Sequence, residues 1–184
     1  MTLARIGAGL LMALAFCGAN AQGKAEKKYP LPGRGTLVVT VPANWIDELK
    51  QDDQTRAPTI SYTLAAGKPP QVMMTPIWPA RSDTPPITKE LVRQYVENAL
   101  KPIREQAVEK SIPIVEFAGK SGAGYYFDAT DKDPAPGEFK YLRQGMLMTN
   151  GIALGFTILT HSRQEPLVRE AMQVLQGAAV APKQ

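Results

Sequence analysis

His161 is the only histidine of the chain and is therefore its main candidate for acid–base chemistry. A general base needs a hydroxyl to activate and an acid to orient it; Ser162 follows directly, and folding could bring Asp128 near. Ser162, however, stands three residues before Glu165, the spacing of a capping box, and no G-x-S-x-G motif surrounds it. We therefore predict no catalytic residue and no enzyme. A small hydrolase that uses His161 as general base is the alternative.

Methionines form a second set with possible chemistry, because thioethers suit Cu(I). The chain has seven, but Met1 and Met12 belong to an N-terminal leader described below. Met146 and Met148 share one face of an expected strand, which is typical of methionines that fill a core. Core packing is therefore the preferred interpretation of the methionines.

Acidic residues gather around one expected turn and could hold Ca²⁺: Asp128, Asp131, Asp133 and Glu138. Their spacing lacks the central glycine and the terminal acid of a calcium loop. A single histidine without cysteine cannot build a usual zinc site either. We predict neither a metal nor another cofactor.

The loop over residues 76–86 carries the best candidate for a binding surface. It holds Trp78 and Arg81 among four prolines, and Trp and Arg are common hot-spot residues at protein interfaces. A loop stiffened by proline also loses less entropy on binding. We predict that Trp78 and Arg81 contact a partner. The alternative is that Trp78 only anchors the loop to the core.

The first 21 residues have the pattern of a cleavable signal peptide. Arg5 supplies a weak positive region, an apolar run follows, and Ala19-Asn20-Ala21 is a small-residue cleavage site. The apolar run is shorter than the roughly 20 residues that a membrane span needs. We predict export to the periplasm or beyond after cleavage following Ala21. The alternative is a lipoprotein anchored through Cys17, although Phe16 stands where a lipidation motif has a small residue.

Cleavage would remove the single cysteine and one basic residue, so the formal charge falls from +4 to +3. A mature chain of this kind has no disulfide and must be stabilised by its core. No run of Lys or Arg is long enough to predict nucleic-acid binding, and no later stretch is apolar enough for a membrane span.

Apolar patterning predicts one domain over residues 36–177, between a flexible N-terminal tail (22–35) and a C-terminal tail (178–184). Alternation predicts strands at 36–41, 58–64, 71–78, 113–118 and 124–129. Trp45 is expected in a turn or a short helical piece. A helix begins near Thr88 and kinks or restarts at Pro102; its expected buried stripe is Leu91, Val92, Tyr95, Ala99 and Ile103.

Residues 139–175 predict two long strands and a closing helix. Asn150-Gly151 lies between the strands, and Asn-Gly is the strongest short hairpin signal because both residues tolerate positive φ. Short links between strands favour antiparallel pairing, and strands grouped apart from helices indicate an α+β protein. We predict a single antiparallel sheet of about six or seven strands with helices packed on its faces, an α/β/α sandwich.

Several short patterns resemble the PsbP-like and Mog-type family. They are the strand that ends at Val41-Pro42 with Trp45 close behind, the central helix, the strand entry at Gly122–Tyr126, and the final hairpin and helix. The resemblance covers roughly residues 34–177 and implies a sheet with helices on both faces. It implies no reaction, because known members are mostly binding or assembly factors. We therefore expect an exported, non-catalytic accessory or binding protein that acts through a protein partner in the cell envelope.

Overall fold

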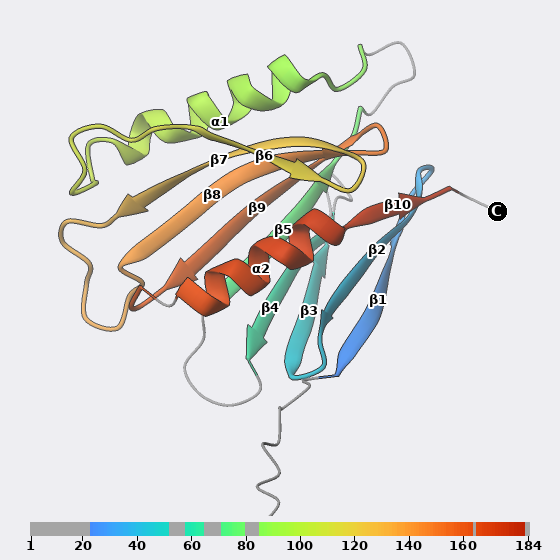
Figure 1. Cartoon of the computed structure of the whole chain (residues 1–184), viewed down its shortest axis with the longest axis horizontal. Coiled ribbons are helices and arrows are strands. Elements are labelled where there is room, and N and C mark those ends of the chain that lie inside the picture. The colour runs from blue at the N-terminus through green and yellow to red at the C-terminus, as the bar shows by residue number, and fades with distance from the viewer. Residues whose placement is uncertain (1–22, 52–57, 65–70, 80–84, 164, 183–184) are drawn as a thin grey trace, which may run out of the picture.

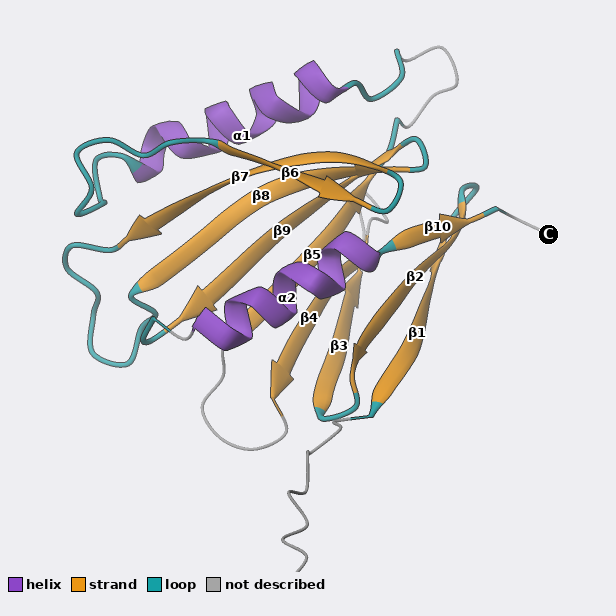
Figure 2. Ribbon diagram, viewed as in Figure 1, coloured by secondary structure: helices purple, strands orange, loops and turns teal. Residues whose placement is uncertain are grey.

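The computed structural model describes residues 23–51, 58–64, 71–79, 85–163 and 165–182. Strands form most of this part of the chain, and two helices accompany them (Figure 2). The predicted signal peptide and Arg81 lie outside the described residues.

Seven antiparallel strands form the larger sheet (Figure 1). In spatial order they are β3 (Trp45–Gln51), β4 (Pro58–Leu64), β5 (Gln71–Ile77), β9 (Ile152–Thr160), β8 (Tyr141–Thr149), β7 (Gly122–Thr130) and β6 (Val115–Gly119). The central strands come from the hairpin that the sequence predicts.

A smaller antiparallel sheet has the order β1 (Lys24–Leu31), β2 (Gly35–Pro42) and β10 (Ala179–Ala181). Our prediction of a single-sheet α/β/α sandwich is therefore wrong, because the described chain is a β-rich fold with two sheets. Two of the missed strands lie where we expect tails. Lys24–Leu31 is too polar to show a strand pattern, yet Tyr29 and Leu31 are buried at its end.

The turn of the long hairpin agrees with its sequence. Thr149 pairs with Ile152, so the loop has two residues, and both have positive φ: 46° at Asn150 and 80° at Gly151. Such a turn matches the twist of the strands that it joins. The predicted hairpin is confirmed.

Helix α1 (Lys89–Ile103) lies over β7 and β8. The helix begins close to Thr88, as predicted, and the Thr88 hydroxyl caps it by accepting the backbone N–H of Leu91 at 3.2 Å. Pro102 lies in the last turn, and the helix ends one residue later, at Ile103. The buried stripe is Val92, Val96 and Leu100. Tyr95 is instead 49% exposed, because the helix covers β7 and β8 and leaves the neighbouring strands open on that side.

Helix α2 (Glu165–Gly177) lies on the opposite side of the large sheet and contacts β2 and β6 (Figure 1). The expected capping box cannot be followed, because residue 164 and the side chain of Glu165 lie outside the described set.

Two separate cores cover the two faces of the large sheet. The first core joins that sheet to the small sheet and α2, and includes Leu37, Val39, Ile60, Tyr62, Val72, Met74, Leu154, Phe156, Ile158 and Leu175. The second core lies under α1 and consists of Val92, Val96, Leu100, Ile112, Tyr125, Phe127, Ala129 and Ala153. The second core is smaller because α1 spans only part of its face.

Candidate functional site

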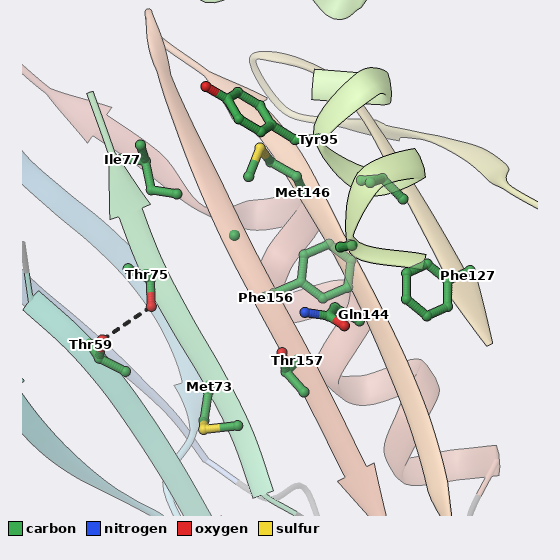
Figure 3. A pocket seen from close by; sticks show the side chains of 14 residues that line it. Thr59, Met73, Thr75, Ile77, Tyr95, Phe127, Gln144, Met146, Phe156 and Thr157 are labelled. Carbon is green, nitrogen blue, oxygen red and sulfur yellow. Dashed lines mark hydrogen bonds between the residues drawn. The ribbon is translucent and has the colours of Figure 1, made fainter. Parts of the chain in front are cut away.

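A groove lies beside α1 on the face of the large sheet that carries the second core (Figure 3). We call it the sheet groove and define it by Met73, Thr75, Tyr95, Gln144, Met146 and Gly155. Its volume is about 340 Å³. Strands β4, β5, β8 and β9 supply its floor, and α1 supplies one wall.

The groove is deepest at the centre of its floor, where Gly155 has no side chain and Thr75 has a small one. Thr75 pairs with Gly155, and Gly155 pairs in turn with Met146, so these residues form one row across the sheet. A Cβ built on Gly155 would meet no heavy atom closer than the carbonyl oxygen of Thr75, at 3.6 Å. A side chain there would therefore fit the backbone and occupy the groove.

The two ends of the sheet groove differ in polarity. Ile77, Tyr95 and Met146 surround one end, where Figure 3 shows the Tyr95 ring beside the Met146 thioether. Gln144 and Thr157 pair across β8 and β9 at the other end.

The polar side chains of the groove are few and neutral. The hydroxyls of Thr59 and Thr75 are 3.1 Å apart and bond to each other. Gln144 and Thr157 line the groove and have no side-chain hydrogen bond to another described residue. No charged side chain is among the described residues that line the groove.

The opposite face holds a buried hydroxyl network instead of a groove. The Tyr29 hydroxyl lies 2.8 Å from that of Tyr62 and donates to Asp47 at 2.9 Å. Lys27 forms an ion pair with Asp47 at 2.9 Å, and this hydrogen-bonded contact lowers the pKa of Asp47. Burial raises the pKa of Tyr62 to about 12. Burial and the bond to Tyr62 also raise the pKa of Tyr29. This network ties the small sheet to the large one.

The two edges of the large sheet also differ. At β6, the Gln176 side chain donates to the carbonyl of Ala118 at 3.0 Å, and the Lys120 N–H donates to the Gln176 carbonyl at 2.8 Å. At the other edge, no described strand pairs with the outer side of β3 over residues 45–50. Ile46 and Leu49, on β3, are 56% and 52% exposed. Helix α2 thus covers one edge and leaves the other open.

His161 is exposed at the end of β9 and is not placed beside the acid considered from sequence. Its Nδ1 lies 3.0 Å from the carbonyl oxygen of Glu138, and its ring stacks on Phe139 at 4.4 Å. Asp128 instead accepts two hydrogen bonds from Arg143, at 2.6 and 2.7 Å. The Arg143 guanidinium also lies 4.3 Å from the centre of the Tyr126 ring. Asp128 is therefore paired with Arg143 and not with His161.

Trp78 follows β5, is half-buried and packs against the first core. The next residue, Pro79, accepts a hydrogen bond from Arg34 at 2.9 Å, which ties the start of the loop to the β1–β2 turn. A partner contact through Trp78 stays a prediction.

The residues considered for metals are dispersed over the fold. Met74 and Met172 are buried in the first core, whereas Met146 and Met148 pack against the second. Asp131 accepts the N–H of Asp133 at 2.9 Å within its turn. Within the described ranges, no three His, Cys, Asp or Glu side chains are close enough to hold a metal ion.

The sequence analysis missed the sheet groove. Its floor residues alternate with core residues along each strand, so they read as the ordinary solvent face of a sheet. Gly155 was the one sign of the groove in the sequence, because a glycine inside a strand often marks a place where a ligand or another backbone approaches closely.

Comparisons with known proteins bear on the fold alone. No family model matches the chain, and no curated protein matches it. It is similar to a crystal structure from Bacteroides thetaiotaomicron VPI-5482, with a TM-score of 0.55 and 15% sequence identity. The similarity covers 88% of this chain and 50% of that one, so the chain spans about half the length of this neighbour. The resemblance to PsbP-like and Mog-type proteins stays a prediction. No helix of the described residues is long and apolar enough to cross a membrane.

Proposed function

We propose that this protein is an exported, non-catalytic binding protein that acts through a protein partner in the cell envelope. The observation that carries the proposal is the open edge at β3, where Ile46 and Leu49 are both more than half exposed. An extended segment of the partner pairs with β3 and adds a strand to the large sheet.

Exposed backbone donors and acceptors along an edge strand are a template for another strand. Main-chain hydrogen bonds supply affinity in this mode, and side-chain contacts on the two faces supply specificity. Ile46 and Leu49 lie on opposite faces of β3, because side chains alternate along a strand. Each face of the added strand therefore meets one apolar side chain.

Charges at this edge limit how the partner approaches. Glu48 and Lys50 form an exposed ion pair of 3.5 Å within β3. Charged residues on an edge strand oppose unselective pairing. The partner segment is therefore one with apolar residues placed against Ile46 and Leu49, rather than any extended chain. Trp78 and Arg81 are the second proposed contact.

Site-specific photo-cross-linking in the native host tests the β3 contact. A photoreactive phenylalanine analogue replaces Leu49 in one variant and Val108 in the control, where Val108 is 58% exposed and lies outside the sheets. We expect a discrete protein adduct from position 49, lost on adding Ile46→Arg, and none from position 108. Equal adducts at both positions, or none at position 49, would contradict the contact.

Export is tested separately by the intact mass of the protein purified from its host. The expected mass begins at Gln22, because the small residues at Ala19 and Ala21 favour cleavage after Ala21. A mass that includes the first 21 residues, or a lipid on Cys17, would contradict cleavage after Ala21.

A further inference from the structure

We infer that the sheet groove binds a small, neutral aromatic molecule that carries an uncharged hydrogen-bonding group. This site is distinct from the β3 edge and does not rest on the proposed protein partner. The inference depends on four properties of the groove: its size, its charge, its polar end and its sulfur and aromatic lining.

The size of the groove limits the ligand. Ligand pockets in proteins have volumes of about 300–1,000 Å³, and 340 Å³ is near the lower end of that range. Tyr95 and Ala99 of α1 stand on one side of the groove, and Gly155 leaves its floor open. One ring with a short substituent fits this space.

The charge of the lining selects neutral ligands. All the described residues that line the groove are uncharged. An ionised group placed there would lose hydration without gaining a counter-charge from the described lining, which is a large cost in an apolar site. A carboxylate or an amine is therefore disfavoured relative to an amide of the same shape.

The polar end orients the ligand. The Gln144 side-chain amide offers both donors and an acceptor, and the Thr157 hydroxyl lies directly across the β8–β9 pair. A carboxamide on the ligand complements both groups. Because neither side chain has another hydrogen bond within the described part of the chain, the ligand need not displace a protein partner.

The lining of the groove favours an aromatic body over an aliphatic one. Met73 and Met146 contribute thioethers from β5 and β8 (Figure 3). Sulfur makes favourable contacts with aromatic rings. Tyr95 also lines the groove and is 49% exposed, so a ring above Gly155 meets both sulfur and aromatic surface.

NMR titration of the mature protein with 4-ethylbenzamide tests the inference, with 4-ethylbenzoate as the charged probe of matched shape. We expect saturable shifts of the backbone amides of Met73, Gly155 and Thr157. We also expect the benzoate to bind at least tenfold more weakly. Shifts spread over the surface without saturation, or equal affinity for the two probes, would overturn the inference.

Two matched glycine variants locate the site. Gly155→Leu fills the groove and should weaken 4-ethylbenzamide at least tenfold. Gly177→Leu is the control, because a Cβ there meets nothing within 4 Å and lies on α2. Unchanged affinity in folded Gly155→Leu would overturn the site.

Two further variants keep the test decisive. Ala99→Phe fills the groove from α1 and replaces Gly155→Leu if that variant does not give a native-like spectrum. Gln144→Leu should reduce the preference for the amide over the benzoate at least threefold. An unchanged preference would show that Gln144 does not orient the ligand and would overturn the predicted pose.

Discussion

The two faces of the large sheet are built from the same strands but are covered to different extents. On β4, β5 and β9, the residues that face the small sheet and α2 are large and almost fully buried: Ile60, Tyr62, Val72, Met74, Leu154, Phe156 and Ile158. Apart from Met73, the groove residues between them are small or polar: Thr59, Thr75, Gly155 and Thr157. The first face is closed by two elements, and the second is only partly covered by α1. A groove arises where a sheet is wider than the helix that covers it.

Truncation on the two faces of β9 should give the largest contrast. Leu154→Ala removes a fully buried side chain from the first core and should cost about 2–5 kcal/mol of unfolding free energy. Thr157→Ala on the groove face should change it by less than about 0.5 kcal/mol. Urea denaturation of both variants measures the difference. Similar losses would show that the groove face is packed as tightly as the core.

Trp78 tests how far the closed face extends beyond the strands. Because its half-buried ring packs on the first core, Trp78→Ala should destabilise the protein by about 2–3 kcal/mol, less than a fully buried tryptophan. Thermal melts, together with the adduct yield from position 49, decide the role. A stability change within about 0.5 kcal/mol and a weakened complex would assign Trp78 to a partner interface instead.

Gly151 tests the register that assigns residues to faces. A one-residue slip of β9 would exchange its core and groove side chains. Gly151→Val places a β-branched residue at a φ of 80° and should cost about 1–3 kcal/mol. Gly177→Val is a control at a glycine without positive φ. An unchanged denaturation midpoint for Gly151→Val would contradict the tight turn.

The pH dependence of stability above pH 9 should give the smallest contrast between the two faces. Tyr62 ionises near pH 10 in the unfolded chain but only at about 12 in the folded one. Its contribution is therefore complete below pH 10 and is lost as pH rises towards 12. Between pH 9 and 11 it should account for about 1 kcal/mol of lost stability. Denaturation at both pH values should show a shallower loss for Tyr62→Phe than for the half-exposed control Tyr95→Phe. Equal slopes would contradict the buried phenol.

Local signals in the sequence predicted local structure well. Asn150 and Gly151 tolerate positive φ, so the two-residue turn between β8 and β9 is a property of those residues. Thr88 caps α1 through its own hydroxyl, which requires only the next turn of the chain. Strands with clear alternation were predicted within a few residues. These features need no distant partner, which is why one-dimensional patterns contain them.

Tertiary structure alone decided the second sheet and the groove. Strand β1 is largely polar and becomes a strand because it pairs with β2, and Tyr29 reaches Tyr62 and Asp47 from it. The spacing of Tyr95 places it in an apolar helix stripe. It nevertheless borders the groove, because α1 covers β7 and β8 but not the strands beyond them. The width of the sheet relative to the helix depends on pairings between distant segments. No local pattern of residues encodes that relation, so the site became visible only when the strands were assembled.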